Sequence, residues 1–152
     1  MDKIKVGLVG CGVIAERAYL PEIAKMPKAS LVAVCDQVES RALQASAKHA
    51  VPQVYTDLDE MLERSGIDLL VNTTHIQAHF DVNLRALKAG KHVYSEKPMT
   101  GTVLEANVLI EEARSRGLKL GAAAATMLNP VNQKIVAMIR NGAIGKVSFA
   151  IA

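Results

Sequence analysis

Small residues at a fixed spacing near the N-terminus form the first motif with a possible chemical role. The run Gly10-Cys11-Gly12-Val13-Ile14-Ala15 has the pattern GxGxxA and directly follows a short apolar segment. In this pattern the first glycine allows a tight turn, the second admits a pyrophosphate close to the backbone, and the small last residue lets a helix pack against the strand. We therefore expect residues 10–14 to bind a dinucleotide at the N-terminus of a helix. The alternative is an ordinary turn between a strand and a helix.

A carboxylate follows the second predicted strand, at the distance from the glycines that dinucleotide-binding folds require. Asp36 lies roughly 20 residues beyond Ala15. Its carboxylate would accept hydrogen bonds from the adenosine ribose hydroxyls and repel a 2′-phosphate, which favours NAD over NADP. Arg41, one turn into the next helix, leaves NADP as the less favoured cofactor. A solvated aspartate at the end of a strand is the alternative interpretation.

A lysine follows the fifth predicted strand, in the run Ser95-Glu96-Lys97-Pro98. Ligands of open α/β sheets bind at the carboxyl edge, where this run is expected to lie. The Lys97 ammonium is a point charge that can orient a substrate hydroxyl and stabilise negative charge on its oxygen, so Lys97 is the candidate catalytic residue. An exposed lysine in a turn is the alternative, and the bond from Lys97 to Pro98 could be cis.

Polar residues after the fourth predicted strand are further candidates for cofactor contacts. Thr73, Thr74 and His75 follow that strand directly. His79 could face the nicotinamide, or it could lie on the surface of a helix. The two cysteines and four histidines have no spacing typical of a metal site, so we expect no metal.

Alternating strand-like and helix-like segments must position these residues. The expected strands are 4–10, 31–36, 53–55, 67–73, 91–95, 118–123 and 146–152, and the expected helices are 12–25, 39–50, 57–66, 78–89, 102–117 and 131–140. Short turns between such segments predict βαβ units and a doubly wound, mainly parallel α/β sheet of the Rossmann type, with strand order 3-2-1-4-5-6 and helices on both faces. Glu60 is placed as a capping-box partner of Asp57. Thr102 with Glu105 is expected to open a later helix, with Val103, Ala106, Ile110 and Ala113 on one apolar face.

The composition excludes several classes of protein. The chain has 152 residues, half of them hydrophobic, and only 3% aromatic residues, which predicts one globular domain with aliphatic packing in its interior. Its 18 Lys and Arg are spread among 15 Asp and Glu, so neither nucleic acid nor a membrane surface is an expected partner. No apolar run approaches the roughly 18 residues of a spanning helix, and we expect a cytoplasmic protein with free thiols.

The motifs together resemble one family, the Gfo/Idh/MocA oxidoreductases. The resemblance lies in the glycine motif, Asp36, and the segments AGKHVYSEKP at 89–98 and GAIGKV at 142–147. It implies a domain that binds NAD or NADP, with Lys97 contacting the substrate and the nicotinamide ribose and Glu96 lining the nicotinamide side. Thr74-His75-Ile76 stands where the family usually has T-P-N. An arginine that often follows the sixth strand in the family has no counterpart here.

By this resemblance we expect hydride transfer between a nicotinamide cofactor and a hydroxyl or carbonyl carbon of a sugar, polyol or related small molecule, in a homo-oligomer. Residues 1–124 are the expected dinucleotide-binding domain, and 125–152 a linker helix and the first strand of a substrate domain. Without that domain the chain is expected to bind cofactor and be inactive, and 146–152 to pair with another chain or be disordered. The alternatives are a non-catalytic NAD(P)-sensing regulatory module and a nucleotide-independent interaction domain.

Overall fold

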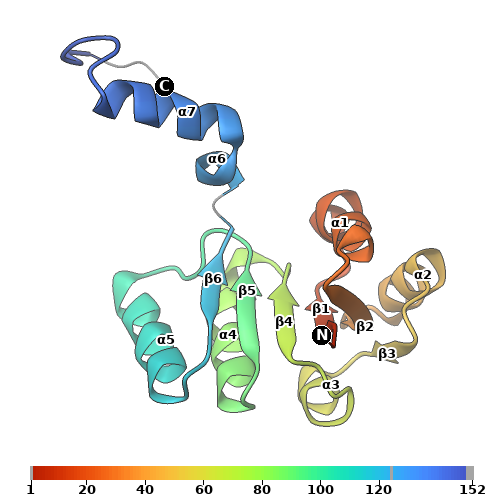
Figure 1. Cartoon of the computed structure of the whole chain (residues 1–152). Helices are drawn as coiled ribbons and strands as arrows, with labels where there is room; N and C mark the ends of the chain where they lie inside the picture. Colours follow the sequence, from red (N-terminus) through yellow and green to blue (C-terminus); the bar gives the residue numbers. More distant parts are fainter. Residues whose placement is uncertain (1, 124, 150–152) are drawn as a thin grey trace.

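The fold is built on one parallel sheet. The computed structural model describes residues 2–123 and 125–149. Six strands lie in the order β3-β2-β1-β4-β5-β6, which confirms the predicted order (Figure 1). Their bounds are β1 Ile4–Val9, β2 Ala29–Cys35, β3 Gln53–Tyr55, β4 Leu69–Asn72, β5 His92–Ser95 and β6 Leu120–Ala122. All five pairings are parallel, so the carboxyl ends of the strands meet at one edge.

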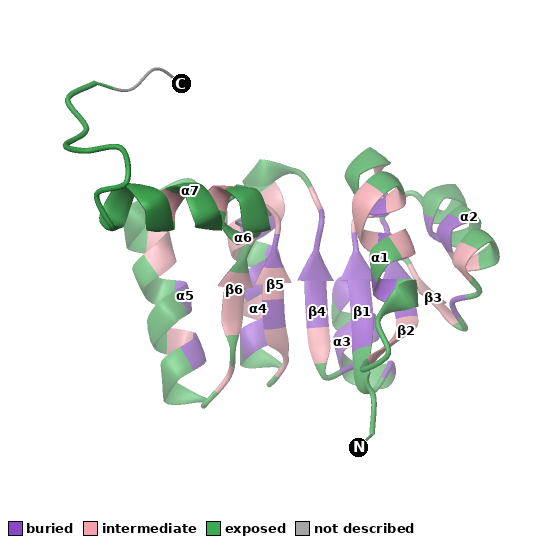
Figure 2. Ribbon diagram, turned by 45° about the horizontal axis from the view of Figure 1, so that its top comes forward, coloured by how far each residue is buried: buried purple, intermediate pink, exposed green. Residues whose placement is uncertain are grey.

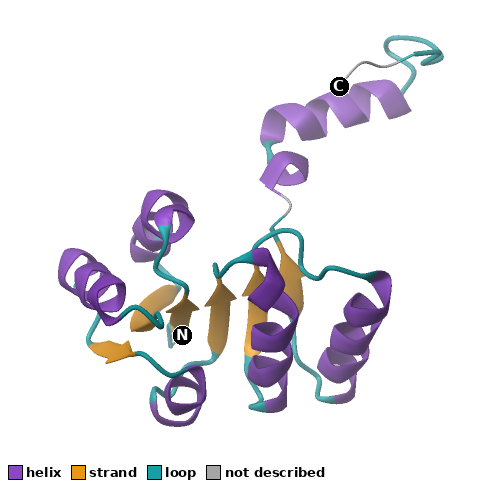
Figure 3. Ribbon diagram, turned by 180° about the vertical axis from the view of Figure 1, so that it is seen from behind, coloured by secondary structure: helices purple, strands orange, loops and turns teal. Residues whose placement is uncertain are grey.

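Helices cover both faces of this sheet. Their bounds are η1 Ala15–Tyr19, α1 Leu20–Lys25, α2 Glu39–His49, α3 Leu58–Arg64, η2 Ile76–Ala78, α4 His79–Lys88 and α5 Val103–Ser115. One aliphatic core joins α1 and α2 to the sheet, and a second joins α3, α4 and α5 to its other face. Figure 3, seen from behind, shows α4 and α5 side by side against the strands.

The helix after the glycine motif departs from the single helix expected over 12–25. Residues 15–19 form a π-helical turn, and α1 follows from Leu20. Pro21 explains the change, because it has no N–H to donate to Arg17 and its ring crowds that carbonyl group. Turns of this kind are frequent at functional sites, and this one carries Tyr19.

The buried face of α5 differs from the one that the sequence pattern predicted. Leu109 and Ala113 are buried, whereas Val103 and Ile110 are 76% and 42% exposed. The helix start was predicted correctly: the Thr102 hydroxyl accepts from the Glu105 N–H, and the Glu105 carboxylate accepts from the Thr102 N–H. Four of the apolar residues of α5 are exposed because its other face covers only the edge of the sheet, next to α4.

Residues 125–149 project beyond the sheet, and Figure 2 shows them exposed along most of their length. They form α6 Ala125–Leu128 and α7 Pro130–Arg140, of which only α7 was expected. The expected strand at 146–152 is wrong for 146–149, which are irregular, and 150–152 lie outside the described residues. A strand needs a partner for its backbone hydrogen bonds, so the predicted pairing with another chain stays a prediction.

Candidate functional site

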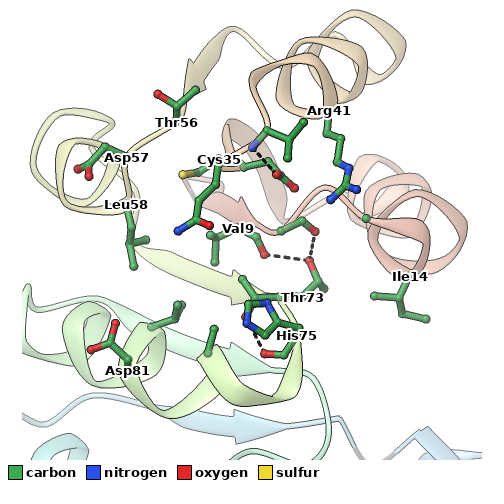
Figure 4. A pocket seen from close by; sticks show the side chains of 18 of the residues that line it. Val9, Ile14, Cys35, Arg41, Thr56, Asp57, Leu58, Thr73, His75 and Asp81 are labelled. Carbon is green, nitrogen blue, oxygen red and sulfur yellow. Dashed lines mark hydrogen bonds between the residues drawn. The ribbon is translucent and has the colours of Figure 1, made fainter.

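A cavity of about 470 Å³ lies at the carboxyl edge of the sheet, where β1, β2 and β4 end (Figure 4). It gathers residues from the glycine turn, the loop after β2 and the loop after β4. The predicted cofactor residues that line it are Gly10, Gly12, Val13, Ile14, Asp36, Arg41, Thr73, Thr74 and His75. Segments that are far apart in the sequence therefore converge on one site.

The two glycines of the turn face different surroundings. Gly10 has φ +90°, and a Cβ added there would stand 2.7 Å from the Thr74 nitrogen and 2.8 Å from the Thr73 carbonyl oxygen. No L side chain fits this position without moving the β4 loop. A Cβ on Gly12 would meet nothing within 4 Å, so open space lies over this part of the backbone. That is the space in which a pyrophosphate approaches the turn in this type of motif.

Asp36 is held rigidly at the end of β2. One carboxylate oxygen accepts from the Cys11 N–H at 2.8 Å and the other from the Val38 N–H at 2.8 Å. Only 8% of the residue is exposed. Each carboxylate oxygen can accept more than one hydrogen bond, so Asp36 can still bind ribose hydroxyls. The cavity also contains the exposed Arg41, from the first turns of α2.

The β4 loop is joined directly to the glycine turn. The Thr73 hydroxyl contacts the carbonyl oxygens of Val9 and Gly10 at 3.0 and 2.8 Å, as the dashed lines in Figure 4 show. The Asn72 side-chain oxygen accepts from the backbone N–H and the hydroxyl of Thr74. Two loops of the cavity thus form one rigid unit.

Cys11 and His79 do not line this cavity. The Cys11 side chain is buried, although its backbone N–H helps to fix Asp36. His79 is only 1% exposed, so the expectation that it lies on the surface of a helix is wrong. The start of α4 packs beneath the loops after β4 and β5, and a contact between His79 and the nicotinamide stays a prediction.

Glu96 and Lys97 lie at the same sheet edge but outside the lining of the cavity. Tyr19 donates from its hydroxyl to one Glu96 carboxylate oxygen at 2.7 Å, and the Lys97 N–H donates to the other at 2.8 Å. Burial, and then the hydrogen bond to Glu96, raise the pKa of Tyr19 above its usual value, so the phenol remains a donor. The Lys97 side chain is exposed, and the bond from Lys97 to Pro98 is cis.

Sequence reasoning missed several residues at this edge. Tyr19 carries no motif, and its link to Glu96 joins residues 77 positions apart. Asp57, Asp81 and Arg85 line the cavity. Arg85 also forms an ion pair with Asp59 at 2.7 Å. The spacing of Asp81 and Arg85 on α4 was the one available signal, since residues four apart share a helix face.

Among residues 2–123 and 125–149, no cluster of three His, Cys, Asp or Glu side chains is arranged to hold a metal ion. None of the helices in the same ranges has the length and apolar character needed to cross a membrane.

The comparisons with known proteins agree with this geometry. A family model described as "Oxidoreductase family, NAD-binding Rossmann fold" (GFO_IDH_MocA) matches residues 4–124. Oxidoreductase P35 of Formosa agariphila is 31% identical over 149 residues, which are 98% of this chain and 46% of that protein.

Two solved structures extend the comparison. The scyllo-inositol dehydrogenase of Lactobacillus casei with bound NAD(H) and scyllo-inositol has a TM-score of 0.88 and 26% identity, over 95% of this chain and 43% of that one. A 3-ketoreductase of Actinomadura kijaniata in complex with NADP has a TM-score of 0.89 and 31% identity, over 95% and 46%. The chain thus spans less than half the length of these relatives.

Both cysteines are buried free thiols, and Cys35 is one of the residues that line the cavity. Burial, and then the charge of Asp36, raise the pKa of the Cys11 thiol to about 12. Burial, and then the charges of Asp57 and Asp36, raise the pKa of Cys35 to about 12. The thiolate is the reactive form, so both thiols are unreactive in the folded chain.

We predict that a thiol reagent at pH 8 labels the folded chain far more slowly than the urea-unfolded chain. A pKa raised from 9.0 to about 12 lowers the thiolate fraction about a thousandfold, since each pKa unit is a factor of ten. Because the folded-state pKa is the higher one, the free energy of unfolding should also fall as the pH rises above 9. The double variant Cys11→Ala, Cys35→Ala is the control and should lose this part of the pH dependence. Equal labelling rates in both states would contradict the burial of the thiols.

Proposed function

This chain belongs to the Gfo/Idh/MocA oxidoreductase family with an NAD-binding Rossmann fold, and we propose that its cavity binds NAD in preference to NADP. The observation that carries the proposal is the open space over Gly12 beside the fixed carboxylate of Asp36. A pyrophosphate would fit the space over Gly12, and ribose hydroxyls would donate to the Asp36 carboxylate. Relatives with bound NAD(H) and with bound NADP have both been solved, so the choice depends on this chain's own residues.

The preference for NAD rests on Asp36. A 2′-phosphate would place negative charge beside a carboxylate that is almost fully buried, where like charges repel strongly. Arg41 also lines this cavity, and its positive charge is the candidate to offset that repulsion. We therefore propose that the charge of Asp36 weakens the binding of NADP and that the charge of Arg41 restores part of the lost affinity.

Calorimetry tests both whether the cavity binds a dinucleotide and whether it prefers NADH to NADPH. Wild type should bind NADH more tightly than NADPH. Gly12→Val should abolish the binding of both, because its side chain fills the space over the turn. Asp36→Ala should narrow the difference between the two cofactors by removing the repelling charge, and Arg41→Ala should weaken NADPH more than NADH.

Gly66→Ala is the matched control for Gly12→Val. Gly66 also has open space around it but lies away from the cavity, so its substitution should change stability and not binding. If wild type binds neither dinucleotide, the proposed function is wrong. If wild type binds NADPH more tightly than NADH, only the role given to Asp36 is wrong, and the proposal that the cavity binds a dinucleotide stands.

We further propose that Lys97 serves hydride transfer at a hydroxyl or carbonyl carbon of a sugar, polyol or related small molecule. When bound, the nicotinamide would supply or accept the hydride. The Lys97 ammonium would donate a hydrogen bond to the substrate oxygen and stabilise negative charge there. Glu96, oriented by Tyr19 and by the Lys97 N–H, would line the nicotinamide side. The support is the position of both residues at the sheet edge beside the cavity, with the Lys97 side chain exposed.

We propose that the chain alone binds the cofactor without turning over substrate. Hydride transfer needs the substrate held in near-attack geometry and a base within hydrogen-bond reach. The match covers only 46% of Oxidoreductase P35, so more than half of that relative lies outside it. This supports a substrate pocket that is built largely by the part outside the match. Incubation with NAD and a panel of inositols and sugar alcohols should therefore yield no NADH above background. Turnover of any of them that is abolished by Lys97→Ala would contradict this proposal.

Residues 125–152 are proposed to belong to a second folding unit. The family match ends at residue 124, and α7 exposes an apolar stripe formed by Val131, Ile135 and Met138. These residues are three or four positions apart, as expected for a helix face that packs against another element.

A shortened chain tests this boundary. Residues 1–124 alone should fold and bind NADH as tightly as the whole chain, because the sheet is complete at β6. Residues 1–101 are the control: they lack α5 and β6, and their unfolding free energy should be much lower. A loss of NADH affinity in the 1–124 chain, by calorimetry, would place residues 125–152 in the cofactor domain.

A further inference from the structure

A buried histidine lies between the two loops that the proposed function assigns to cofactor and substrate. His79, the first residue of α4, is 1% exposed. Its Nδ1 lies 2.6 Å from the Pro98 carbonyl oxygen, and its Nε2 lies 3.0 Å from the Thr74 carbonyl oxygen. One ring therefore bridges the loop after β4 and the loop after β5.

Both partners of the ring are hydrogen-bond acceptors. A carbonyl oxygen has no proton to donate, so a hydrogen bond at either contact needs an N–H on that ring nitrogen, and a neutral imidazole carries one N–H. An apolar ring of similar size would donate to neither oxygen. Such a substitution would leave the carbonyl group that the ring serves without a donor in a buried region.

The loop after β5 is fastened to α4 at a second point. The Asn83 side-chain amide, one turn beyond His79, donates to the Ser95 hydroxyl at 3.0 Å and to the Met99 carbonyl oxygen at 3.3 Å. Asn83 also accepts from the Asn72 side chain at 2.8 Å. These bonds hold Ser95 and Met99, on either side of Lys97 in the chain, whereas His79 contacts Pro98, which directly follows Lys97.

Thr74 is the point at which this arrangement reaches the cavity. It lines the cavity, and its N–H is held by Asn72. The Thr74 carbonyl, the His79 ring and the Pro98 carbonyl therefore form one continuous series of contacts from the cavity to the loop that carries Lys97.

We propose that His79 is a positioning residue that sets Lys97 relative to the nicotinamide end of the cofactor. The inference rests on the proposed function, since it requires Lys97 to contact the bound dinucleotide. The ring lies outside the lining of the cavity, and in this proposal it acts through Lys97 and not by its own contact with the ligand. Its effect should therefore reach the nicotinamide half of the ligand through Lys97 and leave the adenine half unchanged.

The test compares two ligands on variants of the whole chain. NADH occupies both halves of the site, whereas ADP occupies only the adenine and phosphate half. His79→Phe keeps an aromatic ring and removes the N–H donor, and His79→Gln keeps an N–H donor. Calorimetry should give a dissociation constant for NADH raised about tenfold in His79→Phe, equivalent to the loss of one good hydrogen bond, and an unchanged value for ADP. His79→Gln should recover part of the loss.

A double-variant cycle separates positioning from a general structural role. Lys97→Ala should weaken NADH binding in wild type but add nothing in the His79→Phe background, because Lys97 is already misplaced there. His92→Phe is the matched control: His92 lies at the amino end of β5, accepts from the Lys119 N–H, and should leave both ligands unaffected.

Each outcome decides the inference. If wild type binds neither NADH nor ADP, the proposed function fails and the inference with it. If wild type binds but His79→Phe weakens both ligands equally, or adds its effect to that of Lys97→Ala, His79 is structural only and the inference alone is wrong. Failure of both His79 variants to fold, by circular dichroism, would overturn the inference in the same way.

Discussion

The close approach of the glycine turn to the β4 loop is the constraint on which the site depends. At Gly10 the two backbones leave no room for a Cβ, and the Thr73 hydroxyl joins the carbonyl groups of Val9 and Gly10. This contact joins the first strand of one half of the sheet to the first strand of the other. The cavity opens beside it because the connections from β1 and β4 lead to opposite faces at this point, as in other doubly wound sheets.

Buried apolar and buried polar side chains occupy different parts of the molecule. Aliphatic side chains fill both cores, while the buried polar side chains gather largely at the carboxyl edge: Asp36, Asn72, Thr73, His79, Asn83 and Ser95. Within residues 2–123 and 125–149, no buried side-chain nitrogen or oxygen lacks a hydrogen-bond partner. Each unsatisfied group would cost about 1–3 kcal/mol, so this network is a strong restraint on loop geometry. It prearranges the loops that the proposed cofactor would contact, and Tyr19 extends it to Glu96.

Most of the fold follows from local sequence patterns, and the exceptions have identifiable causes. The strand order, the cap at Thr102 and the positions of the buried strands were predicted because hydrophobic periodicity and turn residues act locally. The face of α5 was predicted wrongly because apolar residues at helical spacing also occur on faces that the sheet does not cover. The strand expected at 146–152 failed for 146–149 because a strand depends on a partner that the local pattern cannot supply.

The sequence by itself determined that the glycine turn, Asp36 and Thr73 to His75 meet at the site. These residues follow strands directly, and parallel strands bring their carboxyl ends together. Only the tertiary structure decided how His79, Tyr19 and Asn83 act. His79 bridges two loops from beneath, and Tyr19 reaches a carboxylate 77 positions away. Hydrogen bonds depend on distances between groups that the chain path separates, and no local pattern records those distances.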